Sequence, residues 1–371
     1  MATAETTRKS RWRVLLSRAA VPLLAIFTAL LVSAGVLLIQ GTNPITAYLA
    51  LGEGAFGSQT AIIETLIKTA PFILAGLGIA LAFRGGLFNI GVQGQLFMGS
   101  VFAVWVGYSV ELPAILHIPL ALLAGMVGGG LWAAIPGILK ARNGAHEVIT
   151  TIMLNFIASI VINWSISPGG PLRAPRTVVP ETLPVLESAR LPALIADTRL
   201  HAGVIVALIA AFVMYWLLWR TVSGFEIRTV GANPSAARYA GINVGRNIVL
   251  TMVLSGALAG LGGGIQVLGL EPYNFTIGFN VGLGFDSIAV AVLGGIHPFG
   301  VVLAAFLFGA MDAGSRLMQL RTKVPIDIVS ITQGLILAFV AANLIIRQLY
   351  RIRAEAEEGP VSLSELWGGE G

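Results

Sequence analysis

The sequence lacks several features on which many soluble enzymes depend. It contains no cysteine, which excludes a disulfide, a thiolate nucleophile and any zinc or iron–sulfur site built on sulfur. Only 11% of its residues are charged, whereas an ordinary soluble domain has about 25%. No G-x-x-x-x-G-K-[ST] phosphate loop occurs, so the chain has no ATP pocket of that type. These absences argue against a soluble fold, redox chemistry and nucleotide hydrolysis by this chain.

More than half of the sequence is hydrophobic, and the hydrophobic residues form long runs. Of the 371 residues, 56% are hydrophobic, and many lie in runs close to the roughly 20 residues that a helix needs to cross a bilayer. Glycine and proline are scattered through these runs, as they are in membrane helices. We therefore expect an all-α polytopic membrane protein with about ten transmembrane helices, at residues 20–40, 62–83, 92–110, 115–139, 148–167, 201–219, 248–269, 285–296, 299–315 and 326–346.

The distribution of lysine and arginine predicts the orientation. Basic loops are retained on the cytoplasmic side, and five basic residues precede the first run. Both termini are then cytoplasmic, with a basic tail over residues 1–19, a transmembrane domain over 20–346 and a second tail over 347–371. The net charge of +5 follows from this topology. No continuous stripe of basic and aromatic residues occurs, so lipid is an expected partner and nucleic acid is not.

Two loops are long enough to have a role of their own. The external loop, residues 168–200, is rich in proline, which is typical of a stiff connector or of a landing surface for an external solute-binding protein. The cytoplasmic loop, residues 220–247, contains a short predicted helix that Asn233 caps and that Pro234 begins. A helix this short is unstable alone, so it either docks on a partner or forms a structural turn. The candidate docking residues are Gly231, Asn233, Pro234, Ala237, Arg238 and Gly241.

A glycine-rich interruption at residues 85–91 is the candidate solute pathway. Non-helical backbone inside a membrane is tolerated only where it is buried in protein or lines water; the alternative is a tight cytoplasmic turn after Arg84. Uncharged amides suit a neutral, hydroxyl-rich solute. A weak echo of the pattern at residues 284–290 favours two related helical halves. The candidate pathway residues are Asn89, Gln93, Gln95, Asn155 and Asp286, with helix capping as the alternative role for Asp286.

Other polar and small residues have structural explanations. Glu64 and Lys68 stand four residues apart, as do Asp312 and Arg316, which predicts an ion pair within each helix. Glycines at every fourth position from 256 to 264 predict close helix packing. The four histidines are isolated, so no catalytic residue, metal or cofactor is predicted.

Four segments resemble one family. Residues 231–241 resemble the coupling helix of ABC importer permeases of the ribose, nucleoside and branched-chain amino-acid superfamily. Residues 82–95, 146–155 and 284–295 are similar to the signatures of its nucleoside permeases, the purine nucleoside and simple-sugar type. The resemblance extends over about residues 60–345, with one departure at Gln93, where relatives often carry glutamate. This departure leaves open whether a charge there matters for substrate choice.

The resemblance implies the function and the partners. It implies a transport subunit that moves a small polar solute, a nucleoside above all, across the bacterial inner membrane. The implied partners are a cytoplasmic ABC ATPase that hydrolyses ATP, a second related permease or a second copy, and an external solute-binding lipoprotein. The alternatives are an ABC permease for a simple sugar and an ion-coupled secondary transporter. A membrane-embedded enzyme would need a nucleophile–base pair, which the sequence does not offer.

Overall fold

The computed structural model describes residues 2–175, 177–276, 278–279, 282–342, 345–346 and 349–350. The expected C-terminal tail, residues 347–371, therefore lies outside the described residues apart from two positions. Helices account for almost all of the regular structure in these residues. The exceptions are two isolated β-bridges, Glu181 with Thr276 and Ala193 with His201.

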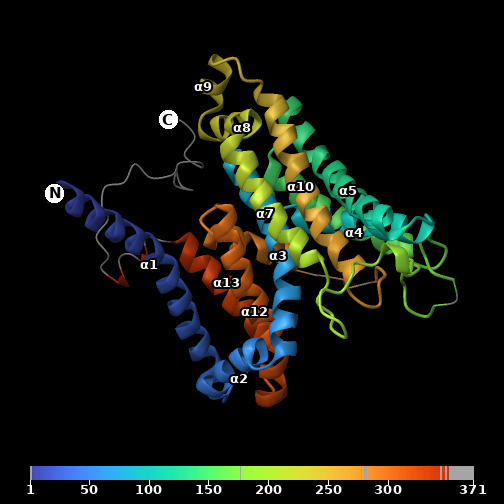
Figure 1. Cartoon of the computed structure of the whole chain (residues 1–371), viewed down its shortest axis with the longest axis horizontal. Helices are drawn as coiled ribbons and strands as arrows, with labels where there is room; N and C mark the ends of the chain where they lie inside the picture. The colour runs from blue at the N-terminus through green and yellow to red at the C-terminus, as the bar shows by residue number, and fades with distance from the viewer. Residues whose placement is uncertain are drawn as a thin grey trace.

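Most of the α-helices follow one another with short connections, and the two longest connections are residues 167–202 and 270–282 (Figure 1). In chain order they are α1 (Ala2–Ile39), α2 (Pro44–Phe56), α3 (Gln59–Arg84), α4 (Val92–Ser109), α5 (Ala114–Asn143), α6 (Glu147–Ile166), η1 (Glu187–Ala189), α7 (Gly203–Arg220), α8 (Val222–Ala232), α9 (Pro234–Tyr239), α10 (Val244–Gly269), α11 (Leu283–Leu293), α12 (Pro298–Thr322) and α13 (Asp327–Ala341). Each of the ten predicted runs coincides with a helix.

Seven helices in the described part of the chain are long and apolar enough to cross a membrane: α1 from residue 20, α3, α5, α6, α7, α10 and α12. The helices α4, α11 and α13 do not meet both conditions. The membrane-protein class is confirmed, whereas the predicted number of ten spans is not.

The molecule has two distinct ends. Figure 1 shows α8 and α9 at one end, which we call the α9 end, and α2 at the opposite end, which we call the α2 end. Helix α3 runs from the α2 end to the α9 end, and α12 returns beside it. These two names are used below to state the depth of a residue along the bundle.

The centre of the bundle is formed by α3 and α10. Helix α10 packs against α5, α4 and α3, while α12 packs against α3 and α2. A Cβ atom on Gly260 would lie 2.2 Å from the carbonyl oxygen of Gly125, so only glycine permits the observed approach of α10 and α5. The predicted glycine strip is thus confirmed as a packing surface.

The outer faces of α5, α6 and α7 are apolar. Leu131, Phe156 and Phe212 are 60%, 61% and 63% exposed. Such a surface is unfavourable in water and is what a helix presents to lipid.

The proline-rich loop between α6 and α7 is folded against the bundle. The backbone amide of Thr182 donates to the carbonyl oxygen of Phe275, and that of Leu186 donates to Gly107, both at 2.9 Å. The Arg190 guanidinium lies 4.5 Å from the centre of the Tyr273 ring. The loop therefore packs over the segment that joins α10 to α11.

Candidate functional site

The interruption after α3 lies inside the bundle. Gly86 has a φ of +70°, which turns the chain back after Arg84. The Asn89 side-chain amide then donates to Ser255 Oγ at 2.8 Å, and Ser255 Oγ donates to the carbonyl oxygen of Gly78 at 2.6 Å. Gly78 is six residues before the end of α3, about 9 Å along the helix. The non-helical segment therefore re-enters the bundle by roughly that depth.

The amide side chains predicted for the pathway hold this segment in place. Asn89 Nδ2 donates to Gln95 Oε1 at 2.8 Å, and Gln95 Nε2 donates back to Asn89 Oδ1 at 2.9 Å. Asn89 Oδ1 also accepts from the Gly91 amide at 3.0 Å. All of these groups are buried, so each polar atom needs a partner. These hydrogen bonds supply partners to the buried polar groups of the non-helical segment.

Asn155 on α6 secures the same segment from the other side. Its Oδ1 accepts from the Gly94 amide and its Nδ2 donates to the carbonyl oxygen of Ile90, both at 2.8 Å. Asn155 is 5% exposed. The structure thus brings Asn89, Gln95 and Asn155 together around one break, although they come from separate elements.

Gln93 joins this break to the second one. Its Oε1 accepts from the Gly284 amide at 2.8 Å, and a Cβ atom on Gly284 would lie 2.4 Å from the Gln93 nitrogen. The first residues of α4 and α11 therefore touch inside the bundle. Helix α11 has 11 residues, or about 16 Å, roughly half of a 30 Å hydrocarbon layer.

Asp286 lies in the first turn of α11. The cap position is occupied by Gly282, and no side chain hydrogen-bonds to this helix start as a cap. The Asp286 carboxylate is partly buried, and the carboxylate of Asp312 is near enough to interact with it electrostatically. The residue therefore places a negative charge at the end of a half-length helix inside the bundle.

The predicted ion pairs within helices are wrong. Lys68 Nζ lies 3.1 Å from Asp312 Oδ2, which joins α3 to α12. Glu64 Oε1 lies 2.8 Å from Arg199 Nη1, which joins α3 to the loop before α7. Packing of the helices places Asp312 closer to Lys68, and Arg199 closer to Glu64, than the oppositely charged residue four positions away in the same helix. Ion pairs within a helix stabilise it only slightly, so little free energy is lost when the residues pair across helices instead.

The predicted short helix is confirmed as α9. Asn233 Oδ1 accepts from the Ala236 amide at 2.9 Å, Pro234 is the first helical residue, and Gly241 follows with a φ of +81°. Ala237 is fully buried, whereas Tyr239 is 97% exposed. Helix α9 is thus anchored by one side chain and presents the rest of its surface outward.

The contact between the α8–α9 segment and the break was not predicted. A Cβ atom on Gly231 would lie 2.2 Å from the Arg84 carbonyl oxygen and 2.7 Å from the Gly86 nitrogen. One on Gly86 would lie 3.0 Å from the Gly231 Cα. Backbone thus lies directly on backbone. The only sequence signal was glycine at each position, and nothing in the sequence indicated that the two meet.

Aromatic and cationic groups surround this contact. The guanidinium groups of Arg84 and Arg228 lie 5.6 and 5.9 Å from the centre of the Trp219 ring. Arg84 Nε donates to the carbonyl oxygen of Ile296 at 3.0 Å. The ends of α3, α7, α8 and α11 are therefore tied together at the α9 end.

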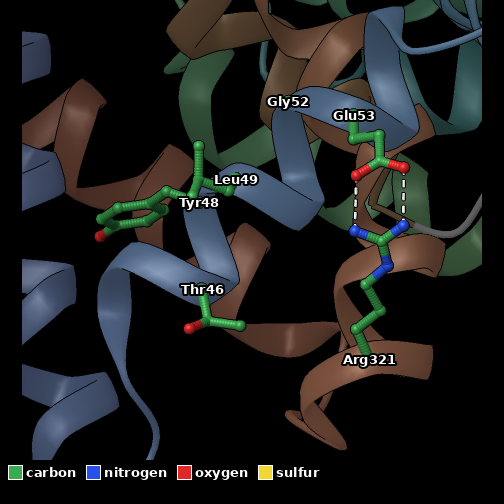
Figure 2. Close-up of a pocket in the computed structure, with 6 residues that line it drawn as sticks. All are labelled: Thr46, Tyr48, Leu49, Gly52, Glu53 and Arg321. Carbon is green, nitrogen blue, oxygen red and sulfur yellow. Dashed lines mark hydrogen bonds and ion pairs between the residues drawn. The ribbon is translucent and has the colours of Figure 1, made fainter.

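An open pocket of about 580 Å³ lies at the α2 end, remote from the break. Its lining residues are Thr46, Tyr48, Leu49, Gly52, Glu53 and Arg321 (Figure 2). Figure 2 shows Glu53 and Arg321 extended toward one another in a two-bond ion pair, with distances of 2.5 and 2.6 Å. Hydrogen bonding to Arg321 lowers the pKa of the Glu53 carboxyl below its ordinary value. The pair joins α2 to α12.

The described residues contain no group of three or more histidine and acidic side chains placed to bind a metal ion. The side chains that hold the break by hydrogen bonds are amides and a hydroxyl, which donate and accept hydrogen bonds without carrying charge. The arrangement suits recognition or gating of a neutral solute.

Comparisons with known proteins give a consistent result. The family described as the permease component of branched-chain amino acid transport systems matches residues 61–341. The guanosine ABC transporter permease NupP of Bacillus subtilis is 45% identical over 90% of this chain and 95% of its own length. The nucleoside ABC transporter permease NupB of Lactococcus lactis is 39% identical over 88% and 91%. A glucose ABC transporter permease of Haloferax volcanii is 33% identical over 89% of each chain. No solved structure matches significantly.

Proposed function

Because the chain belongs to the family of permease components of branched-chain amino acid transport systems, we propose that it is the membrane-spanning subunit of an ABC importer for a nucleoside. It is a multi-pass protein of the bacterial plasma membrane. The observation that carries the nucleoside assignment is the 45% identity to a guanosine permease over 90% of the chain.

The partners follow from the same assignment. An ABC importer needs a subunit that hydrolyses ATP, and this sequence has no phosphate loop of its own. We assign that role to a cytoplasmic ABC ATPase. A second related permease, or a second copy of this chain, completes the membrane part, and an external solute-binding lipoprotein delivers the solute.

The basic residues favour one orientation. Arg84, Arg220 and Arg238 lie at the α9 end, and basic residues collect on the cytoplasmic side. The α9 end is therefore assigned to the cytoplasm, the α2 end to the outer side and both termini to the cytoplasm. In this orientation the proline-rich loop faces outward, where it is positioned to receive the binding protein.

The exposed surface of α9 is the proposed docking site for the ATPase. Asn233, Pro234 and Arg238 are exposed on it, whereas Ala237 anchors the helix to the bundle. Movement of α9 reaches Gly231 at the end of α8, and Gly231 rests on the backbone of Gly86. This contact is the proposed route by which closure of the ATPase dimer displaces the break.

The break itself is the proposed gate of the pathway. Asn89, Gln95 and Asn155 hold it in one arrangement through hydrogen bonds, and Gln93 links it to the start of α11 and Asp286. Helices interrupted at depth are where solute sites occur in many transporters. Because bound solute and ATP favour different arrangements of this network, they shift its equilibrium.

A simple sugar is the second candidate solute, favoured by the 33% identity to a glucose permease. An ion-coupled transporter is a more distant alternative, to which the carboxylates of Asp286 and Asp312 give some support. The first alternative differs from the proposal in the solute carried and the second in the energy source, so experiments can distinguish each of them from it.

Deletion and rescue test the proposed cargo. The gene for this chain is deleted in its own bacterium, and uptake of radiolabelled guanosine, adenosine and glucose is measured with and without the restored gene. The proposal expects nucleoside uptake to fall on deletion and to return on rescue. Loss of glucose uptake with intact nucleoside uptake would transfer the assignment to a sugar.

A further inference from the structure

The ion pair between Lys68 and Asp312 lies well inside the ends of helices α3 and α12. Lys68 is nine residues beyond the start of α3, and Asp312 is ten residues before the end of α12. At 1.5 Å per residue these are about 14 and 15 Å from the α2 end of each helix. From the α9 end, where Arg84 bonds to Ile296 just before α12, Lys68 is 16 residues and Asp312 is 14 residues away, or about 24 and 21 Å. In a hydrocarbon layer of roughly 30 Å that begins at the α9 end, the pair therefore lies inside the layer, in the half nearer the α2 end.

The pair is also half-exposed at that depth. The exposed fractions of the Lys68 and Asp312 side chains are 38% and 37%. A charged side chain inside the hydrocarbon layer is costly, up to about 2.5–3.5 kcal/mol at the centre on insertion scales, and such residues face a bundle interior or a water-filled cavity. The surface that carries this pair is therefore unsuited to lipid.

Helix α7 shows what a lipid-facing surface looks like at the same depth. Ile205 lies 15 residues before Arg220, the end of α7, which is about 22 Å from the α9 end. It is 45% exposed, and its neighbours Leu208 and Ile209, one turn further along α7, are 48% and 57% exposed. The contrast between α7 and the face formed by α3 and α12 distinguishes two environments at one depth.

Further charged groups continue the polar face in both directions. Glu64, one turn of α3 nearer the α2 end, pairs with Arg199 at 2.8 Å, and Arg316 is exposed one turn nearer the same end of α12. Toward the middle of the bundle, the Asp286 carboxylate is close enough to that of Asp312 to interact with it electrostatically. A stripe of charged residues thus runs from the α2 end to the middle of the bundle.

The stripe carries no net charge. Glu64, Asp286 and Asp312 are acidic, while Lys68, Arg199 and Arg316 are basic. A balanced stripe neither attracts nor repels ions strongly, and its carboxylates can accept hydrogen bonds from neighbouring hydroxyl groups. This chemistry fits a neutral solute that carries hydroxyls, such as the ribose of a nucleoside.

We propose that this stripe lines the water-filled outer half of the solute pathway, with Asp286 at its inner limit. The inference rests on the proposed function for the identity of the solute. The claim that the stripe is in contact with water does not depend on the solute. A stripe covered by lipid or by protein would be inaccessible to water whatever solute is carried.

The absence of cysteine makes this claim directly testable. Arg316→Cys and Lys68→Cys are introduced separately into the complete complex in membrane vesicles, and labelling of this subunit by a membrane-impermeant methanethiosulfonate is timed. Arg316→Cys leaves the Lys68–Asp312 pair intact and so guards against misfolding of the other variant. Ile205→Cys is the control at matched depth on the apolar face.

The expected result follows from the chemistry of thiols. Because only the ionised thiol reacts and ionisation needs water, the stripe variants should be labelled at least about tenfold faster than Ile205→Cys. Labelling of both stripe variants no faster than the control would overturn the proposal. Guanosine, added with the binding protein, should slow labelling. Fast labelling that guanosine leaves unchanged would keep the hydrated stripe and count against the nucleoside as cargo.

Discussion

At the scale of single residues, the account depends on Asn89. Its side chain uses both N–H groups and its carbonyl oxygen in hydrogen bonds to Gln95, Ser255 and Gly91. The sequence identified Asn89 as a polar residue beside a break, because glycines and amides in an apolar run are visible locally. It did not reveal the role of Ser255, which lies 166 residues away.

Replacing Asn89 with leucine should destabilise the protein more than replacing its partner Ser255 with alanine. Asn89→Leu leaves several buried polar groups unpaired, each of which costs about 1–3 kcal/mol, so we expect a loss of about 3 kcal/mol. Ser255→Ala removes one hydroxyl and should cost about 1 kcal/mol. Thermal unfolding of the purified complex measures both. Equal losses would contradict a central role for Asn89.

Gly231 tests the contact between the coupling segment and the break. Gly231→Ala places a Cβ atom 2.2 Å from the Arg84 carbonyl oxygen, and overpacking of this kind costs about 1–3 kcal/mol. We expect solute uptake to fall while basal ATP hydrolysis by the partner remains, because force no longer reaches the break.

Gly245→Ala is the control for this prediction. The added Cβ atom would meet its nearest neighbour at 3.7 Å, an ordinary contact at the same end of the bundle. Uptake should stay normal in this variant. If Gly231→Ala also transports normally, the proposed route between α8 and the break is wrong.

At the scale of helices, local signals were sufficient for some elements and not for others. Helix α9 was predicted because Asn233 caps its start and Pro234 suits its first position, and both signals can be read from adjacent residues. Helix α8, directly before it, was not predicted, because it carries neither a long apolar run nor a distinctive cap. The partners of Lys68 and Glu64 were mispredicted because ion-pair choice depends on which helices meet.

Charge reversal on α9 tests docking of the ATPase. Arg238 is exposed and close to the equally exposed Tyr239, so Arg238→Glu should leave the fold intact. Like-charge contacts in an interface cost several kcal/mol, and 1.4 kcal/mol already corresponds to tenfold. We therefore expect at least an about tenfold loss of solute-stimulated ATP hydrolysis. Lys323→Glu, at the α2 end, is the matched control.

A complex that assembles with Arg238→Glu and hydrolyses ATP normally in response to solute would contradict the docking role of α9. Substitution of Ala237 is less informative, since this side chain is fully buried and a larger residue would disturb the anchor itself.

At the scale of the whole molecule, the distribution of basic residues predicts which end faces the cytoplasm. Ser235→Cys on α9 and Asp197→Cys in the proline-rich loop are both exposed positions in a chain that has no other cysteine. In intact cells, an impermeant thiol reagent should label position 197 and not position 235. In inverted membrane vesicles that hold this chain without the ATPase, which would otherwise cover α9, position 235 should be labelled and position 197 should not. The opposite pattern would overturn the orientation.

Energy coupling is the central claim, and transport by the reconstituted importer tests it most directly. The complex, purified through a tag on this chain, is placed in liposomes with the solute-binding protein, and entry of radiolabelled guanosine is followed with ATP supplied on the α9 side. The account predicts accumulation that requires ATP hydrolysis and is lost with Arg238→Glu. Uptake that continues without ATP and disappears when an ion gradient is removed would contradict it.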